Sequence, residues 1–70
     1  MTLNNAELLK EHIISDIKTD DPELDAFLFS LGCYSGEPIT VISRNKNNLV
    51  VSIKDSRYSI DSYLANAITV

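Results

Sequence analysis

The stretch that decides the fold lies between Asp21 and Ile53 and reads DPELDAFLFSLGCYSGEPITVISRNKNNLVVSI. A proline among acidic residues opens it, two glycines interrupt it at positions 32 and 36, and alternating aliphatic residues end it. This order predicts a short capped helix, a corner at the two glycines and then a β-hairpin.

The helix is predicted to begin after Asp21. A residue before proline is held out of the α region, which suits an N-cap, and Pro22 fits the first helical position because its missing N–H is not needed there. Gly32 is expected to end the helix in the left-handed conformation. Apolar residues at helical spacing predict a stripe that faces the core, made of Leu24, Phe27, Leu28 and Leu31. Phe29 lies off that stripe.

The corner leads from the helix into the sheet. Ser35 and Gly36 suit the two central positions of a type II turn, the second of which requires a positive φ. Pro38 fits the first residue of the following strand, where a ladder hydrogen bond can be missing. Asp61 is expected to cap a short helical turn near the end of the chain.

Hydropathy alternates in five places and predicts short strands at residues 12–18, 39–42, 49–53, 58–60 and 68–70. The second and third form a hairpin around a polar turn at residues 44–48. Residues 1–11 form a lead-in segment that fits either a short helical turn or an irregular strand.

Seventy residues allow one domain, so residues 1–70 are predicted to fold as a single unit. Strands on so short a chain bury a core best by curling and closing, which removes open edges. The predicted fold is therefore mainly β, a small barrel of about five short antiparallel strands. One short α-helix is expected between its first and second strands.

Composition limits the classes of partner. The net charge is −4 and the pI about 4.6, and the six Lys and Arg residues are dispersed, so nucleic acid and anionic membranes are not expected as partners. No apolar run reaches the about 20 residues of a membrane helix, and no signal-peptide pattern is present, so we expect a cytoplasmic protein without membrane insertion. A single cysteine excludes an internal disulfide.

Few residues suggest chemistry. His12 lies near Glu11 and Asp16, but a metal site needs about three or four convergent ligands, so an ordinary strand histidine is the favoured interpretation. The acidic run from Asp16 to Asp25 is better explained as the start of a helix than as a cation site. Cys33 has no electropositive neighbour that would make a thiol reactive. We expect no catalytic residue, no metal and no cofactor.

Phe29 and Tyr34 are the less ordinary residues. If the apolar stripe of the helix faces the barrel, Phe29 points elsewhere, and an exposed aromatic residue beside a corner can anchor a partner. Alternatively, the lead-in segment 1–11 folds over Phe29 and covers it.

The chain resembles the ferrous-iron transport protein A family (FeoA). The matching residues are Leu28-x-x-Leu31-Gly32, Ser35-Gly36-x-x-Ile39-x-Val41, the paired strand Leu49 to Ile53 and the closing segment from Asp55 to Val70. The resemblance implies an SH3-like barrel and a small cytosolic, non-enzymatic accessory protein that works with FeoB, a ferrous-iron transporter with a cytosolic GTP-binding domain. The same fold is the C-terminal domain of iron-dependent repressors.

The chain departs from the family pattern at three places. Ser35 replaces the usual proline of the corner, Phe27 stands where a basic residue is common, and the tail reads Asp55-Ser56-Arg57 where Gly-Ser-Arg is usual.

Three hypotheses follow. In the first, the protein is a monomeric adaptor that contacts the cytosolic domain of a FeoB-type transporter through Leu28, Phe29 and Tyr34. In the second, it is a regulatory SH3-like interaction module related to the repressor domain. In the third, it carries metal on His12 and the acidic run.

Overall fold

The computed structural model describes residues 1–70, which form six strands, two α-helices and one 3₁₀ turn. In chain order these are η1 (Leu3–Asn5), β1 (Glu11–Ile13), β2 (Asp16–Ile17), α1 (Pro22–Ser30), β3 (Pro38–Arg44), β4 (Asn48–Ile53), β5 (Ser56–Asp61), α2 (Ser62–Asn66) and β6 (Ile68–Thr69). The predicted hairpin, closing strand and short helical turn after Asp61 are all present.

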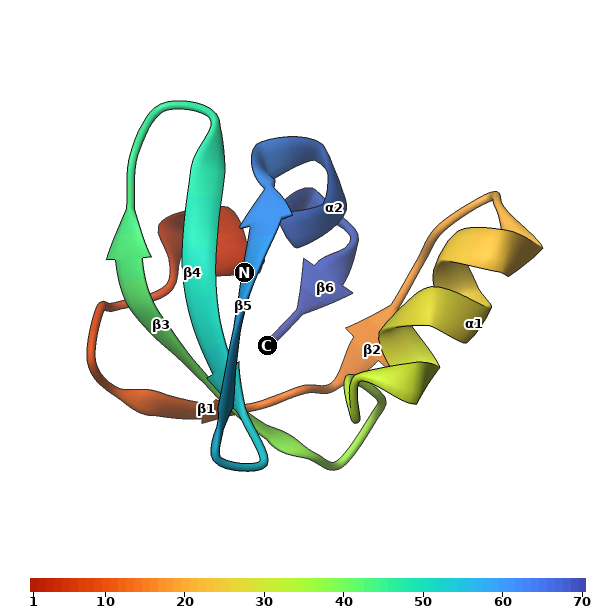
Figure 1. Cartoon of the computed structure of the whole chain (residues 1–70), viewed down its shortest axis with the longest axis horizontal. Coiled ribbons are helices and arrows are strands. Elements are labelled where there is room, and N and C mark those ends of the chain that lie inside the picture. Colours follow the sequence, from red (N-terminus) through yellow and green to blue (C-terminus); the bar gives the residue numbers. More distant parts are fainter.

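The strands form two antiparallel sheets (Figure 1). One has four strands in the order β1-β3-β4-β5, and the other pairs β2 with β6. The prediction of a closed barrel is therefore wrong, because no ladder of hydrogen bonds joins the two sheets into one. The helix position is also corrected: α1 follows the second strand, β2, and precedes the third.

The single strand predicted at residues 12–18 is in fact two strands. Between β1 and β2, the Ile14 N–H donates to the Glu37 carbonyl at 2.9 Å and the Ser15 N–H donates to the Thr69 carbonyl at 2.8 Å. The chain thus leaves one sheet and joins the other at this point. Alternating hydropathy looks the same for one strand and for a strand that changes sheets, which explains the error.

Local signals set the ends of α1 as predicted. The Asp21 side chain accepts from the Glu23 N–H at 2.9 Å and Pro22 is the first helical residue. At the other end Gly32 has φ +90°, and the Cys33 N–H donates to the Leu28 carbonyl at 2.9 Å. Together with the bond from the Gly32 N–H to Phe29, this is a Schellman motif.

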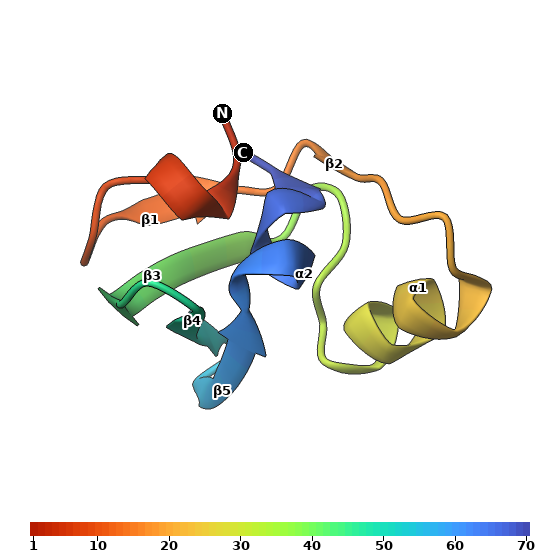
Figure 2. The same cartoon turned by 90° about the horizontal axis from the view of Figure 1, so that it is seen from above.

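The core lies between the two sheets, and residues from both ends of the chain pack into it. Its fourteen buried apolar residues include Leu3 and Ala6 at the N-terminus and Ile68 near the C-terminus. The two termini lie side by side in both views (Figures 1 and 2), and the Val70 N–H donates to the Met1 carbonyl at 2.9 Å. The lead-in segment thus begins with a short turn that completes the core.

The four-residue stripe predicted to face the core is wrong in part. Leu28 is buried and Leu24 packs against the core, but Phe27 is 49% exposed. Figures 1 and 2 both place α1 at one end of the molecule, away from β3 and β4, so only a narrow face of the helix meets the core. Neither helix has the length and apolar character needed to cross a membrane.

Candidate functional site: an aromatic corner beside a pocket

The end of α1 brings two aromatic rings together, and we call the pair Phe29 and Tyr34 the aromatic corner. Their ring centroids lie 4.8 Å apart with the planes inclined by 31°. The Schellman motif at Gly32 turns the chain back so that Tyr34 lies over Phe29, the last but one residue of the helix. The predicted type II turn follows, with Gly36 at φ +92° and the Glu37 N–H donating to the Tyr34 carbonyl at 3.1 Å.

The turn after Tyr34 is hydrogen-bonded to the two residues that join β1 to β2. The Gly36 N–H donates to the Ile14 carbonyl at 2.8 Å, and the Ser35 hydroxyl donates to the Ser15 carbonyl at 3.1 Å. Serine in place of proline at position 35 therefore supplies a hydrogen bond that proline could not. The turn is held against the crossing between β1 and β2.

The tip of the β4–β5 hairpin also contacts the aromatic corner. Lys54 pairs with Glu37, and its ammonium nitrogen lies 5.6 Å from the centre of the Tyr34 ring. The hydrogen bond to Glu37 raises the pKa of Lys54 above its ordinary value. Lys54 and Asp55 both have positive φ, as in the type I′ turns that suit two-residue hairpins. Nothing in the sequence signals this contact, because Lys54 is distant from Tyr34 along the chain.

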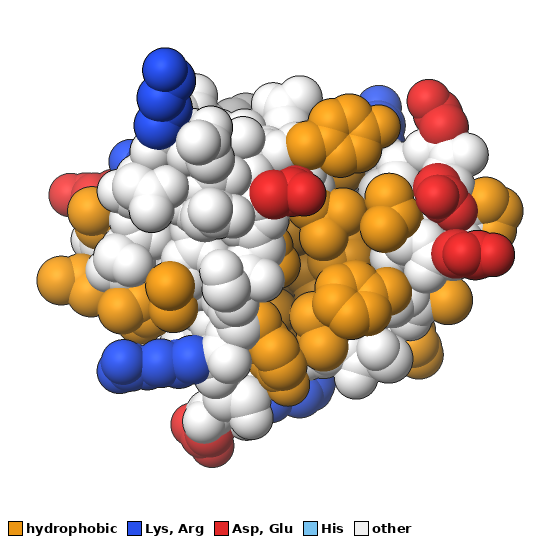
Figure 3. Space-filling view, turned by 45° about the horizontal axis from the view of Figure 1, so that its top comes forward, with side chains coloured by type: hydrophobic (Ala, Val, Ile, Leu, Met, Phe, Trp, Pro, Cys, Tyr) orange, Lys and Arg blue, Asp and Glu red, His pale blue; other side chains and the backbone are white.

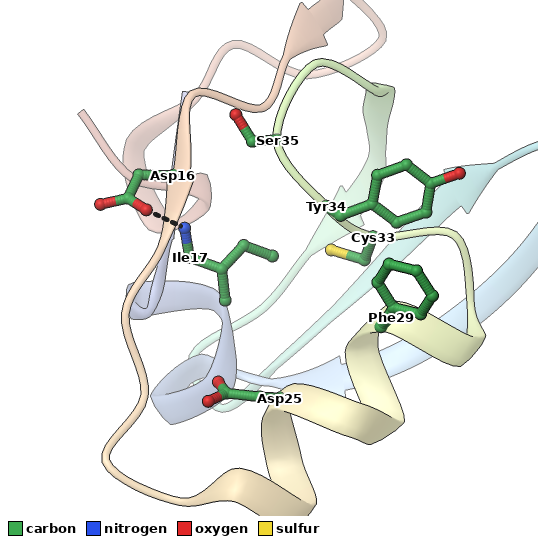
Figure 4. A pocket seen from close by; sticks show the side chains of 7 residues that line it. All are labelled: Asp16, Ile17, Asp25, Phe29, Cys33, Tyr34 and Ser35. Atoms are coloured by element: carbon green, nitrogen blue, oxygen red, sulfur yellow. Dashed lines mark hydrogen bonds between the residues drawn. The ribbon is translucent and has the colours of Figure 1, made fainter.

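A pocket of about 260 Å³ opens beside the aromatic corner (Figure 4). We call it the corner pocket; its lining residues are Asp16, Ile17, Asp25, Phe29, Cys33, Tyr34 and Ser35. They come from β2, from α1 and from the loop that joins α1 to β3. Sequence reasoning missed Ile17, and it considered the two aspartates only as part of the acidic run and not as neighbours of Phe29 and Tyr34. Only the tertiary structure brings β2 and α1 to the same pocket.

The three residues predicted as partner contacts have different surroundings. Phe29 is 65% exposed and Tyr34 is half-buried, and both line the corner pocket. Leu28 is only 1% exposed and packs in the core, so it offers no surface to a partner. The lead-in segment contacts α2 rather than α1, and so Phe29 is not covered in the way that the alternative interpretation required.

Apolar side chains gather in a hollow on this face of the molecule, with acidic side chains at its α1 edge (Figure 3). Cys33 lies at the inner wall and is 1% exposed. Burial raises the pKa of its thiol to about 11, so it is neutral and unreactive at pH 7.

The structure has no group of three or more His, Cys, Asp or Glu side chains close enough together to hold a metal ion. His12 lies on β1, where its Nε2 is 3.3 Å from the Glu7 carbonyl oxygen. The metal-carrier hypothesis, which relied on His12 and the acidic run, therefore has no ligand set in this structure.

Comparisons of structure give the fold. An iron uptake regulatory protein, FeoA, superposes with a TM-score of 0.86 at 20% identity, over 97% of this chain and 91% of that one. The zinc complex of Stenotrophomonas maltophilia FeoA, described as a prokaryotic SH3 domain protein, gives 0.86 at 19% identity over 100% of this chain and 88% of that one. A manganese-dependent transcriptional repressor gives 0.86 at 20% identity, over 97% of this chain but 39% of the repressor. The fold is therefore SH3-like.

Comparisons of sequence give the family. No curated protein matches the chain. The sequence model of the FeoA domain matches residues 1–70, which is the whole chain. This chain therefore belongs to the FeoA domain family, as the residues around Gly32 and Gly36 predicted.

Proposed function

We propose that this protein is a non-enzymatic accessory protein of a ferrous-iron transport system, acting in the cytoplasm as a monomer by binding the cytosolic domain of a FeoB-type transporter. Membership of the FeoA domain family supports the link to ferrous-iron transport. The related Stenotrophomonas protein has been suggested as an activating factor of that transport.

The observation that carries the mode of action is the aromatic corner. Phe29 is 65% exposed, yet its ring packs against the ring of Tyr34. The Lys54 ammonium, which pairs with Glu37, lies over the Tyr34 ring in turn. Rigid aromatic side chains lose little entropy on binding and often supply most of the affinity of an interface. Binding rather than catalysis is the role that such a surface suits.

The test is titration of the purified protein with the cytosolic domain of its cognate transporter, with and without guanine nucleotide, by isothermal calorimetry. We expect micromolar or tighter binding that falls about tenfold or more in Phe29→Ala and in Tyr34→Ala. Tyr63→Ala is the matched control, because Tyr63 is 76% exposed on α2 and lies outside the aromatic corner. Absence of binding at high micromolar concentration would contradict the proposal.

A second candidate is a regulatory interaction module. The likeness of 97% of this chain to part of a manganese-dependent transcriptional repressor favours it. The gene neighbourhood separates the two candidates: an adjacent transporter gene favours the accessory role, and an adjacent regulator gene favours the second.

A further inference from the structure

The corner pocket has the size of one side chain. Its volume of about 260 Å³ lies below the about 300–1,000 Å³ of sites for drug-sized ligands. Ile17, Phe29, Cys33 and Tyr34 make its apolar lining. The Cys33 thiol, whose pKa burial raises to about 11, is protonated at pH 7. A large apolar side chain of a partner fits such a pocket better than a cofactor does.

Two carboxylates stand at the rim. Figure 4 shows Asp25 projecting from α1 toward the β2 side of the pocket, and Asp16 projecting outward from β2. Oδ1 of Asp16 accepts from the Ile17 N–H at 2.9 Å, and Oδ1 of Asp25 accepts from the Thr19 hydroxyl. These bonds fix the two side chains and leave the second oxygen of each carboxylate as an acceptor.

The free oxygens have little positive charge nearby. Oδ2 of Asp25 has no hydrogen-bond partner in the chain, and Oδ2 of Asp16 lies 4.0 Å from the ammonium of Lys18, whose side chain is 82% exposed. Lys54, whose ammonium lies 5.6 Å from the centre of the Tyr34 ring, is already paired with Glu37. The first turn of α1 adds Glu23, and the whole chain has a net charge of −4. The rim of the pocket is therefore electronegative.

We infer that the corner pocket binds a basic peptide segment of the partner, taking one apolar side chain into the pocket while Asp25, assisted by Asp16, pairs with a Lys or Arg next to it. The apolar lining supplies affinity, and the carboxylates select against acidic segments by repulsion. The identity of the partner rests on the proposed function, but the chemistry of the segment rests on the pocket.

A peptide titration tests the chemistry without the transporter. The probe is an acetylated and amidated pentapeptide with a central Phe between two Arg residues. It is added to the ¹⁵N-labelled protein up to millimolar concentration, and binding is measured from ¹⁵N–¹H NMR spectra of the protein. We expect chemical-shift changes centred on the pocket residues, Ile17, Phe29, Cys33 and Tyr34. The same peptide with Glu in place of Arg, and the one with Ala in place of Phe, are expected to cause no such changes. Equal shifts with the acidic peptide, or shifts centred elsewhere, would overturn the inference.

A charge substitution tests the same idea on the transporter domain. Asp25→Asn keeps an oxygen that accepts from Thr19 but removes the charge, and we expect about fivefold weaker binding and a weaker dependence on salt. Glu11→Gln is the matched control, because it removes one negative charge from an exposed residue of β1 outside the pocket.

The outcomes separate the two proposals. If the transporter domain binds Asp25→Asn and Glu11→Gln equally well, the inference fails and the proposed function stands. If the basic peptide binds but the transporter domain does not, the proposed function fails and the pocket chemistry stands. Sedimentation that shows self-association, lost in Asp25→Asn, would mean that a second copy of the chain occupies the pocket and would also overturn the inference.

Discussion

Gly32 is the residue at which the fold and the candidate surface depend on each other. Its φ of +90° allows the Schellman motif that turns Tyr34 over Phe29. A Cβ at this position would lie 2.8 Å from Cε of Lys54 and 3.3 Å from Cγ2 of Ile53. The missing side chain thus makes room for the lysine that supports the aromatic corner.

The two corner glycines are predicted to differ in their sensitivity to alanine. Gly32→Ala is expected to lower the free energy of unfolding by about 1–2 kcal/mol. Backbone strain at its positive φ is the main cause, and the close approach to Ile53 and the displacement of the flexible Lys54 side chain add to it. Gly36→Ala is expected to cost about 1 kcal/mol, because its φ is +92° but no atom lies within 4 Å of the added Cβ. Urea unfolding measures both, and equal losses would show that the Lys54 contact is unimportant.

Cys33 is predicted to make stability depend on pH in the alkaline range. Its pKa rises from 9.0 to about 11 on folding, so the thiol ionises first in the unfolded chain. Its contribution is complete below pH 9 and is lost as the pH rises toward 11. Between pH 8 and 10 we expect the loss to be on the order of 1 kcal/mol.

Urea unfolding at pH 8, 9 and 10 measures this loss, and Cys33→Ala is the control. The pKa of Lys54 is also raised on folding, from an ordinary value of 10.5, so its contribution to stability is lost at a higher pH than that of Cys33. The difference between the wild type and Cys33→Ala isolates the thiol. A constant difference across these pH values would contradict the assignment.

At the scale of the element, α1 has ends that are set locally and a face that is set by its surroundings. Asp21, Pro22 and Gly32 fix its beginning and end within the helix and its flanks. Which side is buried depends on where the sheets leave apolar surface uncovered. Here only Leu28 is fully buried, and the apolar spacing of the sequence overstated the width of the buried face.

Two neighbouring residues of α1 are therefore predicted to respond differently to truncation. Leu28→Ala removes a side chain that is 1% exposed and is expected to cost about 2–5 kcal/mol of stability. Phe27→Ala, at 49% exposure, is expected to cost about 1 kcal/mol or less. Chemical denaturation checks both, and a larger loss for Phe27 would favour the original four-residue stripe.

At the scale of the whole molecule, the two chain ends close the core together. η1 contributes buried Leu3, and the Arg44 guanidinium donates from Nη1 to the Leu3 carbonyl at 3.1 Å and to the Ala6 carbonyl at 2.8 Å. The Arg44 side chain, on β3 of the four-stranded sheet, thus holds the N-terminal turn in place.

Arg44→Met is predicted to loosen the N-terminal turn selectively. The substitution keeps an apolar stem but removes the guanidinium donor from both carbonyls. The Leu3 carbonyl keeps its bond from the Ala6 N–H at 3.4 Å, while the Ala6 carbonyl loses its donor, and we expect a cost of about 1–3 kcal/mol. Hydrogen exchange should accelerate at residues 2–6 and at Val70, whose N–H bonds to Met1, while the amides of α1 keep their protection. Uniform acceleration over the whole chain would indicate global destabilisation instead.

The sequence by itself determined the features that depend on neighbouring residues. These are the N-cap at Asp21, the left-handed glycines at 32 and 36, the hairpin of β3 and β4 and the cap at Asp61. These follow from backbone sterics and from hydrogen bonds a few residues apart, which a short stretch already contains. The FeoA family pattern is composed largely of the same local features.

Only the tertiary structure decided how the strands are divided between two sheets, the burial of Leu28 beside exposed Phe27, and the corner pocket between β2 and α1. These depend on contacts between residues distant in the chain, such as Lys54 with Glu37 and Arg44 with Leu3. The hydropathy pattern shows which side chains are apolar, but the packing of the sheets determines which of them are buried and against what surface.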